Sequence, residues 1–307
     1  MIRNALAATA IAASLIIPAG AADLTTREIE NGFKRHATLT QLHRWYLLYE
    51  EPTYGIANQL DILDPYVRVV SGLGEANGHE EYAERLNQIP TTWKNAHDVK
   101  STEVTIADDG GVSLTANITY LNQGLLPDGK VRSADLTYTT KLTPADGVLP
   151  KFTAIKIAQN SEGTAEAFES QYGNNRMRAL VHYWLALIED PSRDAEPVRE
   201  ILADDFVLDF SSGAISDFDG FKTWLAGPGS AVRASTHKIE GFAQRKLDDG
   251  TYEVVMKFDW NGILPNDTEM LARTRHTWIV EDDPTARFAR IKRMGVEVLE
   301  PFRPKEG

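Results

Sequence analysis

The stretch "HYWLALIEDP", residues 182–191, is the second of two copies of one phrase, and this repetition decides the fold. The first copy is "HRWYLLYEEP", residues 43–52, so each residue of the second copy lies 139 positions after its counterpart. The His, Trp, Leu, Glu and Pro of the phrase are identical in both copies. A phrase that recurs after so long an interval indicates that a whole domain is present twice.

The repetition continues along the chain, and its segments keep the same order in both copies. "LDILDPYV" (60–67) matches "REILADDFV" (199–207), "NAHDV" (95–99) matches "STHKI" (235–239), and "QGLLPDG" (123–129) matches "NGILPND" (261–267). Solenoid proteins repeat every 20–50 residues, so this much longer interval excludes them. The length of 307 residues also fits two domains. We therefore expect one domain over residues 22–160 and a second over residues 161–307.

The phrase itself has the spacing of a helix. In the second copy, Leu180, Trp184, Leu187 and Ile188 lie on one helical face, and Pro191 follows where the helix should end. A short helix is expected at 196–203, then a strand, then a third helix at 217–226. The sequence therefore predicts three helices near the start of each copy.

The remainder of each copy has the alternation of strands. Val254, Met256 and Phe258 alternate with polar neighbours, and the pair Asp249-Gly250 predicts a hairpin turn before them. Three helices followed by a long antiparallel meander indicate an α+β domain. We expect the sheet to bury one face against its helices.

The N-terminus has the pattern of an export signal. Arg3 precedes an apolar stretch from Ala5 to Ile17, and small residues follow at 19–21. The stretch is shorter than the roughly 20 residues that span a bilayer. We expect residues 1–21 to be a cleaved signal peptide, which implies a periplasmic or secreted protein.

Composition limits the partners. The chain has 44 acidic and 32 basic residues, a net charge of −12, which disfavours nucleic acids and anionic membranes as partners. It has no cysteine, so no disulfide stabilises the fold. It also lacks HExxH and CxxC motifs, so neither a metal nor another cofactor is predicted.

The motifs "W…EDP…ILADDF", "S-x-H-x-I" and "F-x-W-x-G-x-L-P", in this order, resemble the nuclear transport factor 2-like superfamily. The SnoaL-like polyketide cyclases and the ketosteroid isomerases form the nearest branch. The resemblance covers the second copy and, more weakly, the first. It implies two tandem cone-shaped α+β barrel domains, each with three helices packed on a curved antiparallel sheet around an apolar pocket. Members of this superfamily include enzymes and binding modules, so the fold alone does not decide the function.

The resemblance suggests site residues in the second copy. Tyr183 falls near the tyrosine of ketosteroid isomerases, whose general-base position aligns with the apolar Phe210; this argues against a steroid-isomerase mechanism. His237 resembles a pocket histidine of scytalone dehydratases and shares strand parity with Ile239. Because His97 stands at the same place in the first copy, a neutral core histidine bonded to a backbone carbonyl is the alternative interpretation.

His276 is a second candidate, because it alternates with Thr274 and Trp278 on the more apolar face of its strand. That face could instead pack on a partner domain. The predicted catalytic residues are thus His237 and His276, and the predicted ligand-binding residues are Tyr183, Trp184, Trp260 and Trp278. Trp184 could also be a residue of helix packing, with His182 beside it.

Two functions remain open from sequence. The protein could bind a small, largely apolar molecule in the pocket of its second domain. Alternatively, it could be an isomerase, dehydratase or cyclase that uses histidine-assisted proton transfer on a carbonyl compound. Because separate members of the superfamily usually dimerise through their sheets, we expect an intramolecular pseudo-dimer with the copies packed sheet against sheet.

Overall fold

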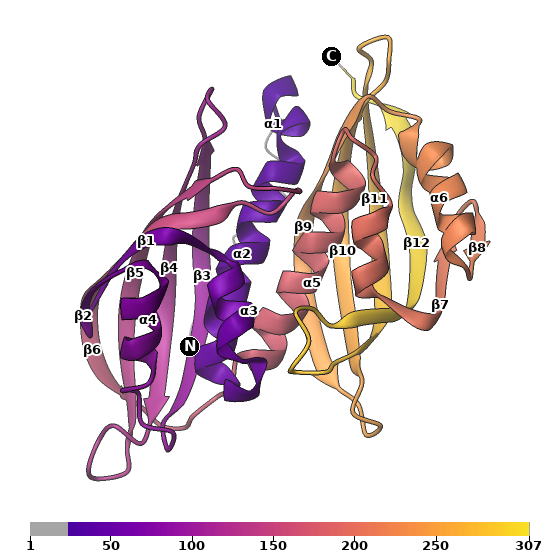
Figure 1. The fold of residues 1–307 in the computed structure, drawn as a ribbon. Coiled ribbons are helices and arrows are strands. Elements are labelled where there is room, and N and C mark those ends of the chain that lie inside the picture. The colour runs from indigo at the N-terminus through magenta and orange to yellow at the C-terminus, as the bar shows by residue number, and fades with distance from the viewer. Residues whose placement is uncertain (1–23, 307) are drawn as a thin grey trace, which may run out of the picture.

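A computed structural model describes residues 24–306, and the predicted signal peptide lies outside this range. The first half begins with helices and ends in four long strands (Figure 1). Its elements are α1 (Thr26–Glu30), α2 (Gly32–Glu50), η1 (Pro52–Tyr54), α3 (Ile56–Asp61), β1 (Leu63–Ser71), β2 (Gly74–Asn77), α4 (Gly78–Leu86), β3 (Lys94–Ile106), β4 (Val112–Gln123), β5 (Val131–Thr143) and β6 (Lys151–Ala165).

The second half repeats this order. Its elements are α5 (Tyr172–Glu189), η2 (Glu196–Ile201), β7 (Leu202–Phe210), β8 (Gly213–Ile215), α6 (Phe218–Ala226), η3 (Pro228–Ser230), β9 (Ala234–Lys246), β10 (Tyr252–Ile263), β11 (Glu269–Glu281) and β12 (Arg290–Pro304). The two six-stranded sheets have equivalent strand orders, β2-β1-β6-β5-β4-β3 and β8-β7-β12-β11-β10-β9. The predicted fold of two tandem α+β domains is confirmed.

The alternation read from the sequence places side chains as expected. On β10, Val254, Met256 and Phe258 are buried, and Met256 pairs with His276 of β11. Gly250 takes the left-handed conformation, with φ 88°, that the turn between β9 and β10 requires. The apolar face of this meander packs on α5 and forms the core of the second half.

Two boundaries differ from the sequence-based expectation. The helix expected at 196–203 is a 3₁₀ turn that ends at Ile201, because Leu202 already begins β7. The expected domain boundary between residues 160 and 161 falls inside β6, whose pairing with β5 continues to Ala165. The last strand of the first half therefore continues beyond the boundary that the repeat suggested.

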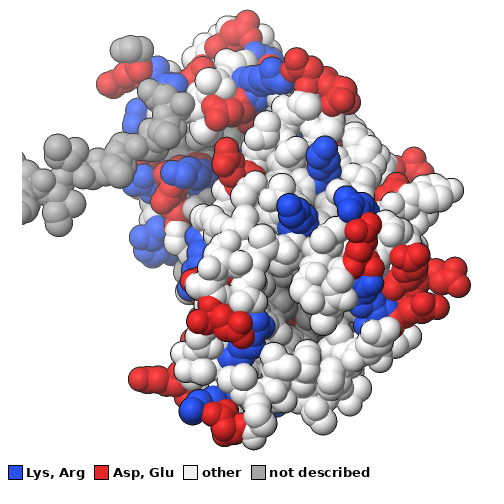
Figure 2. Space-filling view, turned by 90° about the vertical axis from the view of Figure 1, so that its left-hand side faces the viewer, with Lys and Arg blue, Asp and Glu red and all other residues white. Residues whose placement is uncertain are grey.

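The two halves meet through their long helices. In Figure 1, α2 and α5 lie side by side between the two sheets. Every residue of α2 from His36 to Leu47 is buried; Trp45 belongs to the core of the first half, whereas Ala37 belongs to that of the second. A helix buried all round needs neighbours on every side. The predicted sheet-against-sheet packing is therefore wrong, because the halves meet through their helices. Figure 2 shows the outer side of the first half, which faces away from the second half and is largely uncharged in its middle.

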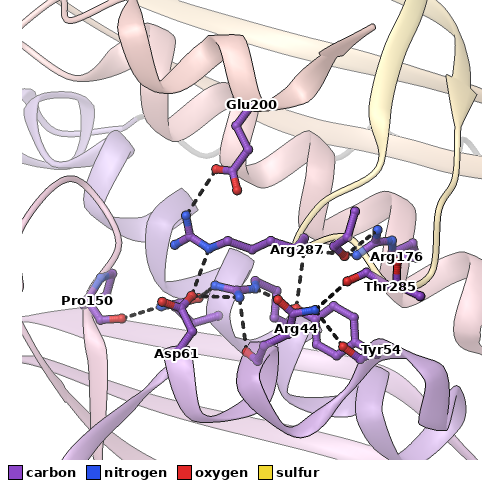
Figure 3. Close-up of polar contacts among 11 residues, drawn as sticks. Arg44, Tyr54, Asp61, Pro150, Arg176, Glu200, Thr285 and Arg287 are labelled. Atoms are coloured by element: carbon purple, nitrogen blue, oxygen red, sulfur yellow. Dashed lines mark hydrogen bonds and ion pairs between the residues drawn. The ribbon is translucent and has the colours of Figure 1, made fainter.

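Charged groups also join the halves, as Figure 3 shows. Arg44 of α2 donates hydrogen bonds to Tyr54 Oη (3.0 Å) and to Asp61 Oδ2 (2.9 Å). Arg287 of the second half donates to the same Asp61 oxygen (2.9 Å). Asp61 thus accepts hydrogen bonds from a guanidinium of each half. Within the described residues, no helix is long and apolar enough to cross a membrane.

Candidate functional site

A buried carboxylate holds the predicted His237. Glu189 is the last residue of α5, and its side chain has no solvent exposure. Its Oε1 accepts hydrogen bonds from both the backbone N–H and the ring Nδ1 of His237, each at 2.8 Å. Since a carboxylate only accepts, Nδ1 carries a proton, and Nε2 is the basic nitrogen of the neutral ring. This is the carboxylate–imidazole pairing that orients a histidine for proton transfer.

The first half contains the same pair. Oε1 of Glu50 accepts from the backbone N–H of His97 at 2.7 Å and from its ring Nδ1 at 3.1 Å. In both halves the histidine thus bonds to a carboxylate and not to a backbone carbonyl. Sequence reasoning missed both glutamates as site residues. The signal was present, because Glu50 and Glu189 occupy the same position of the repeated phrase, and each is the last residue of its long helix.

Each pair is contacted by a residue of the other half. His36 of α2 reaches the second half, where its Nε2 lies 3.0 Å from the carbonyl oxygen of His237 and 3.6 Å from Oε1 of Glu189. Its Nδ1 lies 2.9 Å from Nδ1 of His182. Because a carbonyl only accepts, Nε2 of His36 donates, and the Nδ1 of its neutral ring accepts from His182.

Asn175 of α5 plays the equivalent part in the first half. It stands 139 positions after His36, and its Nδ2 donates to Oε1 and Oε2 of Glu50 at 3.0 and 3.1 Å. The same nitrogen lies 3.0 Å from the carbonyl oxygen of His97, and Oδ1 accepts from Nδ1 of His43 at 2.9 Å. The two networks are therefore related by the duplication.

The two networks differ in how many oxygens of the glutamate are hydrogen-bonded. Both oxygens of Glu50 are hydrogen-bonded, whereas Oε2 of Glu189 is buried and has no partner among the described residues. This oxygen lies beside Gly32, where an added Cβ would come within 2.8 Å of it and within 2.2 Å of Thr236 Oγ1. Glycine at position 32 thus permits the close approach of α2 to β9.

The interface histidines are neutral near pH 7. Burial lowers the pKa of His43 to about 3, and burial together with the neighbouring His36 and His43 holds the pKa of His182 well below its usual range. Burial also lowers the pKa of His36, although Glu189 opposes this. The rings of His43 and His182 stack with their centroids 5.7 Å apart. The interface therefore contains a column of uncharged imidazoles that connects the two networks.

A cavity of about 610 Å³ lies beside this column. It is a groove between the edge strands β3 and β9, with α2 and α5 beneath it. Its walls include the residues His36, His43, Arg178, His182, His237 and Phe242. Among the residues predicted as site residues, His237 lines this groove and the other five do not.

The other predicted residues lie in the core or at its margin. His276 is buried on β11, its Nδ1 has no partner among residues 24–306, and burial lowers its pKa to about 3. The ring of Phe258 lies edge-on to those of His237 and His276, at 5.3 and 4.7 Å. The structure therefore does not bring the two predicted catalytic histidines into contact.

The aromatic residues predicted to bind a ligand make protein contacts. Trp184 and Trp278 are fully buried and meet edge to face at 6.0 Å. Tyr183 stacks on Phe288 at 4.3 Å, and burial raises its pKa to about 12. Trp260 is half-buried, with Phe302 5.0 Å away. Within residues 24–306, no cluster of three or more His, Asp or Glu side chains could hold a metal ion.

Comparison with known proteins gives structural similarity only. No family model and no curated protein matches the sequence. Among solved structures, a hexachlorocyclohexane dehydrochlorinase from Novosphingobium barchaimii matches with 13% identity and a TM-score of 0.39, over 46% of this chain and 97% of that one. A Novosphingobium aromaticivorans protein provisionally named a scytalone dehydratase matches with 10% identity and a TM-score of 0.38, over 44% and 88%. ActVI-ORFA from Streptomyces coelicolor matches with 12% identity and a TM-score of 0.32, over 39% and 95%.

The assignment of fold rests on the chain itself. In each half a long helix precedes a six-stranded sheet, and the first strand pairs in parallel with the last while the meander between them is antiparallel. This arrangement, present twice, is the nuclear transport factor 2-like fold that the motifs predicted.

Proposed function

We propose that this protein is exported and binds a small molecule in the groove between its two halves, with His237 as the polar group that orients the ligand. The observation that carries the proposal is the joint presence of the cavity and a histidine whose Nδ1 is already bonded to Glu189. The backbone N–H and Nδ1 of His237 are both engaged, so Nε2 is the ring atom left to meet a ligand.

The space inside the second sheet is filled by side chains, which favours the groove as the place for a ligand. That interior, where the family resemblance places a pocket, is filled by buried side chains, including Trp184, Phe258 and Trp278. The groove has a volume of about 610 Å³, within the range of 300–1,000 Å³ that small-molecule sites usually have. Leu39, Val99 and Ile239 give it apolar walls.

Catalysis by proton transfer is the second candidate function. The hydrogen bond from Nδ1 to a buried carboxylate fixes the orientation and the tautomer of the ring, so Nε2 is the nitrogen that can accept a proton. The general-base position of ketosteroid isomerases holds Phe210, which stacks on Trp224 at 4.4 Å. Proton abstraction beside a carbonyl would therefore depend on His237 in this protein.

Matched variants of the two halves test the binding proposal. His97 has the same bonds to a glutamate as His237, but it does not line the groove. We expect His237→Ala to weaken the binding of 2-naphthol, measured by calorimetry, by about tenfold, the size of one hydrogen bond. His97→Ala should lower only the melting temperature. Equal affinities in both variants, after correction for the fraction unfolded, would refute a ligand site at His237.

A separate measurement tests catalysis. Exchange of the α-hydrogens of 2-tetralone for deuterium reports proton abstraction beside a carbonyl. We expect an enzyme of this kind to accelerate the exchange in the wild type and in His97→Ala, and to lose the acceleration in His237→Ala. If the wild type binds 2-tetralone without accelerating exchange, the protein binds ligands without this chemistry.

A further inference from the structure

We propose that the ligand of the groove is an organic anion, a carboxylate carried on an apolar body, and that Arg178 binds the carboxylate. This inference rests on the proposed function, because it names the class of ligand for the same site.

Arg178 has a guanidinium that the protein positions but does not pair. It lies on α5, with its guanidinium carbon 4.2 Å from the centroid of the Phe242 ring. Its Nε donates to Oδ1 of Asn174 at 3.1 Å, and within residues 24–306 neither terminal nitrogen has a hydrogen-bond or ion-pair partner. A planar guanidinium stacked on an aromatic ring keeps the fork geometry that matches the two oxygens of a carboxylate.

The other charged groups of the groove leave this cation uncompensated. Lys238 forms an ion pair with Glu240 at 2.7 Å, and Lys100 forms one with Asp98. The lining residues include four cationic side chains, Arg35, Lys100, Arg178 and Lys238, and one carboxylate, Glu28. Since Lys100 and Lys238 are paired and Glu28 lies near Arg35, Arg178 is the half-buried cation of this lining that has no ion-pair partner within residues 24–306.

Burial makes the unpaired charge of Arg178 costly to the free protein. Burial lowers the pKa of Arg178, and the nearby Asp98, which is not within ion-pair distance, opposes this only in part. A half-buried cation without a partner is stabilised when an anion binds to it. A carboxylate in the groove would therefore gain a charge-assisted contact that no protein group within residues 24–306 supplies.

The duplication argues that Arg178 is not required by the fold. Its counterpart in the first half is Leu39, and the counterpart of Phe242 is Thr102. The stacked arginine thus belongs to the second half alone, the half whose histidine also lines the groove. Leu39 itself lies in the same groove, where it can contact the apolar body of the ligand beside Val99 and Ile239.

A pair of isosteric probes tests the inference on the whole protein. 2-Naphthoate and 2-naphthamide share one apolar body and differ in charge. We expect the wild type to bind 2-naphthoate more tightly, and Arg178→Met, which keeps a long apolar side chain against Phe242, to lose about tenfold or more for 2-naphthoate alone. Arg178→Lys should retain part of the affinity, because it keeps the charge without the fork.

Arg199 provides the matched control. Its guanidinium stacks on Phe218 at 3.7 Å, but it does not line the groove, so Arg199→Met should leave both affinities unchanged. If 2-naphthamide and 2-naphthoate bind equally well, and both depend on His237 but not on Arg178, the groove is a binding site and the anion inference is wrong. If neither these probes nor 2-naphthol and linear carboxylates of six to twelve carbons bind, the proposed function itself fails.

Discussion

The carboxylate–histidine pairs of the two halves have the same bonds but different surroundings. His97 is buried, stacks on Tyr46 at 4.6 Å, and is held by a glutamate whose two oxygens are both hydrogen-bonded. The His237 side chain is 14% exposed, lines the groove, and is held by a glutamate with one unpartnered oxygen. The first pair is thus complete as a structural unit, whereas the second keeps polar atoms that protein groups do not satisfy.

The difference originates at one pair of equivalent positions. Asn175 offers an amide that donates to Glu50 and accepts from His43. His36 offers an imidazole, which donates to the carbonyl of His237 and leaves Oε2 of Glu189 without a donor. Each half therefore supplies a residue to the network of the other. A change in α2 alters the site of the second half.

The largest expected effect concerns the two glutamates. Glu50→Ala removes the acceptor for His97 and Asn175 in a buried place, so we expect a loss of about 3–5 kcal/mol in the free energy of unfolding. Glu189→Ala should cost less, about 2 kcal/mol, since one of its oxygens has no partner. Urea unfolding measures both, with the exposed Glu84→Ala as a control. Equal costs would contradict the difference between the pairs.

Acid should weaken the interface. His36, His43 and His182 have pKa values lowered by burial, so below about pH 6.5 the unfolded chain binds more protons than the folded one. Stability should therefore fall as the pH drops below about 6.5, by up to about 1.4 kcal/mol per pH unit for each ring that stays neutral. Urea unfolding at successive pH values measures the slope, and His36→Asn should reduce it. A slope that is unchanged in this variant would show that His36 is not neutral when folded.

The smallest expected effect comes from making the halves alike. His36→Asn places in the second network the residue that the first one has, so its amide can donate to Oε2 of Glu189. We expect a change of less than about 1 kcal/mol near pH 7, in the stabilising direction. The reverse substitution, Asn175→His, removes the donor to Oε2 of Glu50 and should destabilise by about 1–2 kcal/mol. If both substitutions cost the same, the two networks are not related as described.

The sequence predicted the fold because local signals agree with it. The repeated phrase has the spacing of one helix in each half, and the alternation around Phe258 predicts one buried face of a sheet. Strand parity also placed His237 and His276 on the inner face, where the structure has them half-buried and buried.

The groove could not be predicted, because it depends on which faces of the two halves meet. The polar residues His36 and Arg44 lie on the helix that carries the first phrase, and both are buried, which no local pattern in the sequence records. One usable signal is the difference between the copies. Arg178 stands where the first copy has Leu39, and a charged residue that replaces an apolar one between two equivalent helices marks a position with a special environment.

The central claim is that His237, which is paired with Glu189, contacts a ligand, whereas His97, which is paired with Glu50, does not. Side-chain ¹⁵N NMR spectra of the histidines, recorded during a titration with 2-naphthol, test this directly. The account predicts a shift of Nε2 of His237, the ring that lines the groove, with His97 unchanged in its buried place against Tyr46. A shift of His97 equal to that of His237, or a saturable shift of neither, would contradict it.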